Sequence, residues 1–476
     1  MDEYVCETAT VHSEDRLLPA SRLERMIGKP APDWTVEDLV NVVAGQGIRL
    51  VSLIHVGGDG RLKTLDFVPR DPDHLRDVLM AGERADGSSL FGSMGIPAGA
   101  SDIVVRPRVH RAFLHPFSSV PTLGVLCGHL GRDGEPLPES PDTMLRRAAA
   151  RVEAETGVAL HGHAEVEFYL GRAPQQEDIY GIAERGYHAA SPFVFGEAMR
   201  RRAMVILSEI GVPIKYAHSE VGYIKADEMS DLMWEQHEIE LALQPLPDAA
   251  ESNMLTAWVL RNLAHGSGMR LSFDPIIREG HAGNGLHYHM SLVRGGEHLP
   301  MVDGEDGLTT EAKWLVGGLA TLGGALMAFG NRKVSSFVRL AQGKEAPNAI
   351  TWGRSNRKAL IRVPIMVTGP SGRAVSPPTV ELRLPDGSAD PHVLLAGIAQ
   401  AFCVGHALEG LDALVDRTRA ERSKDDPEAA LPVPRSLPEV AAHVQRTRAL
   451  LEAGGVFPTH SIDRLIDALR SGSLEG

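Results

Sequence analysis

Alternating hydrophobic and polar positions predict a β-hairpin near the start of the chain. Residues 48–55 and 62–68 both alternate, and the dipeptide Asp59-Gly60 between them is typical of a hairpin turn. Helical periods over residues 35–44 and 73–80 lie before and after the hairpin. The pattern therefore predicts a small domain of strands and helices, ending near residue 135.

The rest of the chain alternates helices with strands. Ser140-Pro141-Asp142 opens a helix with a capping hydroxyl and a proline in the first turn, and Gly157 ends that helix. Further helices are predicted over residues 196–210, 311–329, 391–408, 439–452 and 461–469. Loops are expected over residues 86–93, which are rich in Gly and Ser, and over the charged residues 417–434.

The fold class that follows is α+β. Residues 1–33 are polar and read as an N-terminal extension, residues 34–135 as the small domain, and residues 136–476 as the larger one. A length of 476 residues also favours two domains over one core.

Three predicted strands of the larger domain carry charged or imidazole side chains two residues apart. The pairs are Glu165 with Glu167, His287 with His289 (and Ser291 beyond), and Glu381 with Arg383. Residues i and i+2 of a strand lie on one face, so each pair points to one side. One such pair is typical of a solvated sheet face, but three beside apolar segments indicate a site.

Two more acids, Glu220 and Glu238, lie on neighbouring predicted strands and could join this face. Two carboxylates ~4 Å apart repel by roughly 4 kcal/mol at an effective dielectric of about 20, so a cluster of them requires cations. Ligands rich in oxygen suit Mg²⁺ or Mn²⁺ rather than zinc, and such ions commonly serve phosphoryl transfer.

Phosphoryl transfer also needs positive charge near the developing anion. Four arginines follow the histidine strand beside apolar segments: Arg339, Arg357, Arg362 and Arg383. No Walker A pattern is present, and the glycine-rich segment before residue 286 precedes a strand, which excludes a P-loop. His161 and His163 are interpreted as structural or surface residues.

Composition narrows the function classes. The 48 basic and 62 acidic residues leave a net charge of −14, which argues against a nucleic-acid partner. The three cysteines have no CxxC spacing, the N-terminus does not resemble a secretory signal, and residues 315–329 read as a buried helix rather than a membrane span. A cytoplasmic protein with no membrane partner is expected.

The chain resembles the glutamine synthetase family over roughly residues 34–410. The resemblance rests on short segments in the family's order: DGSS at 86–89, AEVEF at 164–168, GY at 186–187, HSEV at 218–221, GNGLHYHMS at 283–291, RL at 339–340, EAP at 345–347, NR at 356–357, IRVP at 361–364 and ELRLPD at 381–386. The GNGxHxHxS and EAP segments are the most specific of these.

The resemblance implies ATP-dependent ligation of glutamate with an amine. One Mg²⁺ or Mn²⁺ would be bound by Glu167, Glu220 and Glu238, and a second by Glu165, His287 and Glu381. Glutamate would contact Arg339, Arg383, Glu167 and the Asn284-Gly285 backbone, and the nucleotide would contact His289 and Ser291. Arg357 and Arg362 would stabilise the phosphoryl group, Glu345 would close a flap over it, and Asp86, Ser89 and Tyr187 would receive the amine.

The family resemblance also implies an architecture and an assembly. A small β-grasp domain would precede a larger catalytic domain with an antiparallel sheet surrounded by helices. Because the amine site would be shared between subunits, a homo-oligomer is implied, with a dodecamer of two hexameric rings as the family's arrangement.

The chain departs from the family pattern at three places. Residues 222–234 are inserted between the acids at 220 and 238, so Glu238 is the expected ligand and Glu228, at the family's spacing, the alternative. The family's arginine two positions before Glu381 is Thr379 here. No tyrosine follows Tyr288, so the adenylylation switch of some bacterial members is absent.

Three functions remain open from the sequence. The insertion and Thr379 favour a γ-glutamyl–amine ligase that uses an amine larger than ammonium. Glutamine synthetase proper is the alternative, favoured by Asp86, Ser89, Tyr187 and Glu345. A non-catalytic structural or regulatory relative is the third, and it predicts eroded metal ligands, whereas all six candidates are present.

Overall fold

The computed structural model describes residues 21–176, 178–179, 181–304, 307–343, 346, 349–425 and 431–474. Most of the expected N-terminal extension lies outside this range. Its described end forms helix α1 (Arg22–Ile27), where Ser21 and Glu24 make a reciprocal capping box, and a short turn at Ala31–Asp33.

The first sheet has five strands in the order β2-β1-β5-β4-β3. Their bounds are β1 Leu50–Val56, β2 Leu62–Phe67, β3 Glu83–Asp86, β4 Asp102–Leu114 and β5 Thr122–Leu130. The predicted hairpin is confirmed, because β1 and β2 pair antiparallel, whereas β1 and β5 run parallel. The predicted helices are α2 (Val36–Gly45), capped by Thr35, and α3 (Pro72–Ala81), capped by Asp71.

The loop expected over residues 86–93 is wrong in part. Residues Gly87–Phe91 form the short helix α4, and the Asp86 side chain accepts a hydrogen bond from the backbone N–H of Ser88 at its start. Glycine and serine favour loops in general, but a capped first turn with Phe91 fully buried stabilises this helix locally.

The second sheet has ten strands, and its main path runs β16-β17-β18-β11-β6-β8-β7. The bounds on this path are β6 Ala159–Arg172, β7 Ile214–Ile224, β8 Met233–Leu241, β11 Leu286–Arg294, β16 Trp352–Arg354, β17 Ile361–Val363 and β18 Val380–Leu382. The expected antiparallel sheet is corrected to a mixed one, because β16 and β17 pair in parallel. Alternation of side chains predicts a strand but not the direction of its neighbour.

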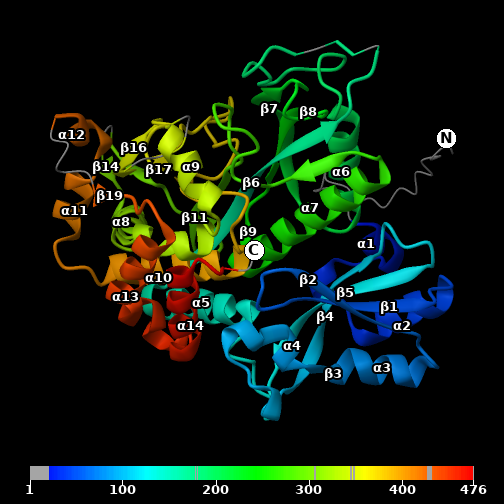
Figure 1. Cartoon of the computed structure of the whole chain (residues 1–476). Helices are drawn as coiled ribbons and strands as arrows, with labels where there is room; N and C mark the ends of the chain where they lie inside the picture. Colours follow the sequence, from blue (N-terminus) through cyan, green and yellow to red (C-terminus); the bar gives the residue numbers. More distant parts are fainter. Residues whose placement is uncertain are drawn as a thin grey trace.

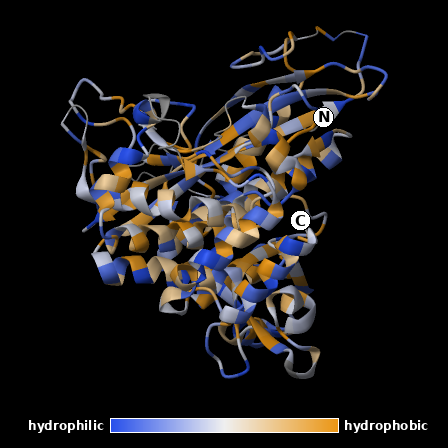
Figure 2. Ribbon diagram, turned by 60° about the vertical axis from the view of Figure 1, so that its left-hand side comes forward, coloured by the Kyte–Doolittle hydropathy of each residue, from blue (hydrophilic) through white to orange (hydrophobic). Residues whose placement is uncertain are grey.

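The helices of residues 141–471 lie around the second sheet (Figure 1). They are α5 Pro141–Thr156, α6 Glu197–Glu209, α7 Leu246–Gly266, α8 Thr310–Gly330, α9 Val334–Gln342, α10 Pro391–His406, α11 Leu411–Arg417, α12 Ala420–Asp425, α13 Leu437–Glu452 and α14 Thr459–Ser471. Hydrophobic residues gather in the interior of the molecule (Figure 2), and α8 and α10 are buried over most of their length.

The start of α5 differs from the expectation in its cap. The helix ends at Gly157, which has a positive φ of 65° as the sequence predicts. Ser140, however, does not cap the first turn, because its hydroxyl lies 2.9 Å from Nδ1 of the buried His129. The helix still begins at Pro141, whose fixed φ suits a first turn.

Helices α8 and α10 pack against each other at very short range. A Cβ added to Gly318 would lie 1.7 Å from the carbonyl oxygen of Ala401, so only glycine permits this contact. In the described part of the chain, α8 is the one single helix that is long and apolar enough to cross a membrane. However, 83% of its most apolar stretch is buried inside the protein. The buried helix predicted for this segment is therefore confirmed.

Candidate active site

The central strands of the second sheet place charged side chains on one face. Glu165 and Glu167 lie two residues apart on β6. β11 runs antiparallel to β6 and places His287 opposite Glu165. On its other side β11 pairs with β18, where Glu381 lies opposite His289. This register gathers residues from three strands that are far apart in the sequence.

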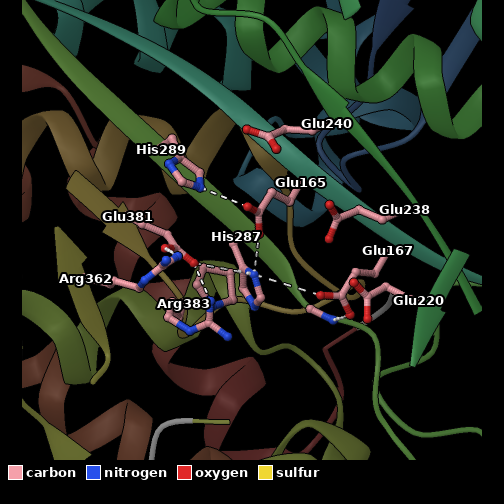
Figure 3. A network of polar contacts seen from close by, with 12 residues as sticks. Glu165, Glu167, Glu220, Glu238, Glu240, His287, His289, Arg362, Glu381 and Arg383 are labelled. Carbon is pink, nitrogen blue, oxygen red and sulfur yellow. Dashed lines mark hydrogen bonds and ion pairs between the residues drawn. The ribbon is translucent and has the colours of Figure 1, made fainter. Parts of the chain in front are cut away.

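β7 and β8 add further carboxylates to the same face. Glu238 on β8 lies opposite Glu167, and His218 on β7 lies opposite Glu238. The ligand atoms of His218, Glu220 and Glu238 all lie within 4.8 Å of one another. Figure 3 shows the acids and imidazoles pointing toward a common space from their strands. The structure thus brings together all six residues expected to bind metal.

Hydrogen bonds connect the imidazoles to Glu165. His287 Nδ1 lies 2.7 Å from Glu165 Oε2, and His289 Nε2 lies 3.0 Å from Glu165 Oε1. His287 Nδ1 also lies 3.8 Å from Glu381 Oε1. The other ring nitrogen of His287 is buried and has no hydrogen-bond partner among the described residues. Nδ1 faces both carboxylates of the expected metal set, which suits a metal ligand, whereas Nε2 faces Gly285.

The carboxylates cannot all ionise without a cation. Burial, and after it the charge of Glu165, raises the pKa of Glu238 well above its usual value. At Glu165 burial opposes ionisation, but hydrogen bonds from His287 and His289 outweigh it and lower the pKa. Protonation of Glu238 is therefore favoured beside Glu165, and a divalent cation would relieve this conflict.

Arginines lie next to the carboxylates, as expected. The fully buried Glu381 accepts a hydrogen bond from Arg362 at 2.7 Å and another from Arg383 at 2.5 Å. Burial and Glu165 raise the pKa of Glu381, but the neighbouring imidazole and guanidinium groups outweigh them and lower it. Arg339 is also buried and donates to two backbone carbonyl oxygens just after β18.

The glycine-rich segment before β11 packs closely on the site. The backbone N–H of Gly285 donates to Glu167 Oε2 at 2.7 Å. A Cβ on Gly285 would lie 2.4 Å from His287 Nε2, so the segment requires glycine here. Asn284 is fully buried and accepts a hydrogen bond from Gln236, which also donates to Glu167. These contacts hold the Asn284-Gly285 backbone against the Glu167 carboxylate.

The residues expected at the nucleotide lie farther along β11. His289 Nδ1 lies 2.9 Å from the Thr379 hydroxyl, the position where the family pattern has an arginine. The Ser291 hydroxyl is buried and lies 2.8 Å from His298 Nδ1. Thr379 therefore has a defined contact in this chain, which orients the imidazole of His289.

The residues expected at the amine are not brought together within one chain. Asp86 and Ser89 lie at β3 and α4, at the opposite end of the molecule from β7 and β8 (Figure 1). Hydrogen bonds from Ser89 and then Ser88 lower the pKa of Asp86 below its usual range. Tyr187 lies near the carboxylates, 48% exposed, and its ring centroid lies 5.2 Å from that of His218.

Arg357, Glu228 and Glu345 complete the expected set. Arg357 is exposed and forms a hydrogen bond with Tyr187, at the edge of the site. Glu228 lies in an exposed turn at the tip of the β7–β8 hairpin, outside the cluster, whereas Glu238 is buried within it. Glu345 lies outside the described residues.

Two residues of the charged face were missed from the sequence. His163 Nε2 lies 2.8 Å from Glu240 Oε1, and the His163 ring stacks on that of His289 at 4.7 Å between centroids. Lys215 also donates to Glu240 at 2.7 Å. The signal was present, because His163 lies two residues before Glu165 and Glu240 two residues after Glu238, on the same faces of their strands.

Known proteins match this chain over most of its length. The family described as "Glutamine synthetase, catalytic domain" matches residues 138–472. The chain is 30% identical over 427 residues to a glutamine synthetase of Pyrococcus horikoshii, covering 88% of this chain and 90% of that relative. The chain therefore belongs to the glutamine synthetase family, and it is a ligase.

Solved structures support the same fold. A Plasmodium falciparum glutamine synthetase matches with a TM-score of 0.74 at 18% identity, covering 92% of this chain and 95% of that one. A structure named "Apo GmaS without ligand" matches with a TM-score of 0.70 at 20% identity, covering 91% and 95%.

Proposed function

We propose that the protein joins an amine to the γ-carboxylate of L-glutamate at the expense of ATP. The observation that carries this proposal is the gathering of six metal-ligand candidates on one sheet face, with three arginines beside them. A carboxylate is a poor electrophile, and phosphorylation converts one of its oxygens into a good leaving group. The site combines the negative charge that binds divalent cations with the positive charge that stabilises a phosphoryl group.

The six candidate metal ligands divide into two sets of three residues. Glu167, Glu220 and Glu238 would hold one Mg²⁺ or Mn²⁺. Glu165, His287 and Glu381 would hold the other. The bound ions supply positive charge that neutralises the carboxylates and the phosphates of ATP. His218, within reach of Glu220 and Glu238, is a further neighbour of the first group.

The arginines orient glutamate and the phosphoryl group. Arg339 would pair with the α-carboxylate and Arg383 with the γ-carboxylate, while Arg357 and Arg362 would face the phosphoryl group. The γ-phosphoryl group of ATP moves to a γ-carboxylate oxygen and ADP leaves. The amine nitrogen then attacks the γ-carbonyl carbon, phosphate leaves with that oxygen, and the nitrogen loses a proton.

The proton would pass to Asp86 of a neighbouring subunit, with Ser89 beside it. This role requires a homo-oligomer, because the two residues and the carboxylate cluster lie at opposite ends of one chain. Two stacked hexameric rings are the arrangement proposed. Glu345 would exclude water from the acyl phosphate as part of a flap.

Glutamine synthetase proper, with ammonium as the amine, is the second candidate. Asp86 favours it, because its pKa is lowered by hydroxyl groups and it remains ionised to attract a small cation. The lengthened β7–β8 hairpin favours a larger amine.

The test is phosphate release by the full-length protein with glutamate, ATP and Mg²⁺ or Mn²⁺. Ammonium, ethanolamine, methylamine and putrescine are added in turn, and release is expected only with an amine present. Glu381→Gln is the inactive control, and Glu228→Gln, at the exposed hairpin tip, should retain activity. No release with any amine removes both candidate functions.

A further inference from the structure

A cavity of about 300 Å³ lies next to the carboxylate cluster. Residues from the segment between β6 and α6 form one wall, and residues from β7 and β8 form the other. Glu220 and Gln236 line the end nearest the cluster, and Gln236 donates a hydrogen bond to Glu167 at 3.1 Å. The cavity therefore shares Glu220 with the carboxylate cluster, beside which the proposed reaction needs its amine.

The walls of the cavity are largely apolar. Ile182, Phe193, Val194, Ala189 and Tyr223 contribute aliphatic and aromatic surface. A single ammonium ion needs about the volume of a water molecule, ~30 Å³, whereas a cavity of about 150 Å³ already holds a benzene ring. The space exceeds what ammonium requires and matches an alkyl or arylalkyl group.

Of the charged residues that line the cavity, Glu220 is the one suited to bind a cationic amine. Glu235 is occupied, because its carboxylate accepts hydrogen bonds from the backbone N–H groups of residues 195 and 196 and lies 2.8 Å from His237 Nε2. Arg185 contributes a positive charge to the same lining. A second ammonium group at the far end of a diamine would meet apolar walls and a guanidinium group, which disfavours it.

Hydrogen bonds attach the first wall, formed by the segment that connects β6 to α6, to strand β7. The Ser219 hydroxyl lies 2.8 Å from the carbonyl oxygen of Gly186 and 2.7 Å from that of Ala189. A Cβ on Gly186 would lie 2.4 Å from the carbonyl oxygen of Glu220, so the close approach requires glycine. The cavity is thus held in shape by direct contacts, as a preformed binding site requires.

The opposite wall comes from the segment that is inserted relative to the family pattern. Gly222 and Tyr223 belong to this insertion, lie in β7 and line the cavity. The insertion continues β7 beyond Glu220 and returns through β8, so it builds a wall that a shorter connection would lack.

From these contacts we infer that the amine substrate is a primary monoamine with an apolar alkyl or arylalkyl tail, which binds in this cavity with its nitrogen at Glu220. The inference rests on the proposed ligase function and specifies its second substrate. Ammonium, ethanolamine and diamines are poor substrates by the same reasoning, because they leave the apolar walls uncovered or bury a charge against them.

The experiment measures kcat/KM for a homologous series of amines with saturating glutamate and ATP. From methylamine to pentylamine, kcat/KM should rise about fourfold with each buried methylene, and phenethylamine should be among the best substrates. Pentylamine and putrescine have the same length, so a higher kcat/KM for pentylamine isolates the penalty of the second charge.

Two variants test the location of the tail. Ala189→Trp fills the cavity and should lower the ratio of pentylamine to methylamine kcat/KM at least tenfold. Val205→Trp adds the same bulk at a position that is 62% exposed on α6, and it should leave the ratio unchanged. Phe193→Ala removes part of the wall and should flatten the dependence on chain length, which provides a second readout if Ala189→Trp does not fold.

The outcomes separate this inference from the proposed function. Activity with ammonium but no gain with chain length overturns the inference and leaves the ligase function standing. Putrescine equal to or better than pentylamine, or an Ala189→Trp variant that slows all amines by one factor, also overturns it. If none of the amines in the panel causes phosphate release, the proposed function itself is contradicted.

Discussion

Glu238→Gln should leave the metal-free protein folded while it reduces the stabilisation by Mg²⁺, because it removes a ligand of one of the two proposed ions. Without a cation, burial and the neighbouring carboxylates raise the pKa of Glu238, which favours its protonated form. Glutamine has nearly the same shape and no charge, so the variant should be at least as stable as the parent in EDTA. An amide cannot supply the ionised oxygen that a divalent ion requires.

The magnitude follows from the spacing of the cluster. Ligand atoms of Glu165, Glu238 and Glu240 lie within 4.8 Å of one another. At that separation or less, two ionised carboxylates repel by at least about 3.5 kcal/mol at an effective dielectric of about 20. A bound ion at one hundred times its Kd adds about 2.7 kcal/mol to the free energy of unfolding. For a chain of 476 residues that unfolds cooperatively, this corresponds to about 3 °C in Tm.

The assay is thermal unfolding in EDTA and in increasing Mg²⁺, with Glu228→Gln as the matched control. The parent and Glu228→Gln should gain Tm with Mg²⁺, and Glu238→Gln, which keeps the ligands of the second ion only, should gain clearly less. Because the ion must displace the proton of Glu238, the gain should increase as pH rises through the raised pKa of this group, and only where Glu238 is present. A full Mg²⁺ response in Glu238→Gln, or its loss in Glu228→Gln, would refute this reasoning.

Three more outcomes are expected from a helix contact, a nucleotide contact and the proposed flap. Gly318→Ala should lower the free energy of unfolding in urea by about 1–3 kcal/mol, because its Cβ would overlap a backbone carbonyl of α10, whereas Gly45→Ala, with open space around it, should raise it by up to about 1 kcal/mol. Equal stabilities would contradict the helix contact. Thr379→Val removes the hydrogen bond to His289, and it should raise the KM for ATP about fivefold with a smaller change in kcat; an unchanged KM would place the nucleotide elsewhere. Glu345→Ala should retain nucleotide binding, measured by calorimetry, and lose most amide formation; normal turnover would show that this residue does not close the site.

The secondary structure followed from periodicity wherever an element buries one side. The hairpin of β1 and β2 and the helix that ends at Gly157 match their predicted bounds within a few residues. Local bonding could not be predicted, because the Ser140 hydroxyl binds the distant His129 instead of capping its helix. The parallel pairing of β16 with β17 was missed because alternation is the same in parallel and antiparallel strands.

The charged face was predictable where two functional residues alternate on one strand. Glu165 and Glu167 show this directly, and the sheet register places their partners beside them. Glu240 was missed because its significance depends on the pairing of β6 with β8, which puts it opposite Glu165. The cavity beside Glu220 could not be predicted either, because its two walls come from segments that are distant in sequence and share no recognisable pattern.

The central claim is that the two carboxylate groups bind a pair of divalent cations. The most direct measurement is anomalous X-ray diffraction from crystals of the protein grown with Mn²⁺. The account predicts one anomalous peak among Glu165, His287 and Glu381 and a second among Glu167, Glu220 and Glu238. Crystals saturated with Mn²⁺ that show no peak at either position, or that bind Mn²⁺ only outside this cluster, would contradict the two-cation site.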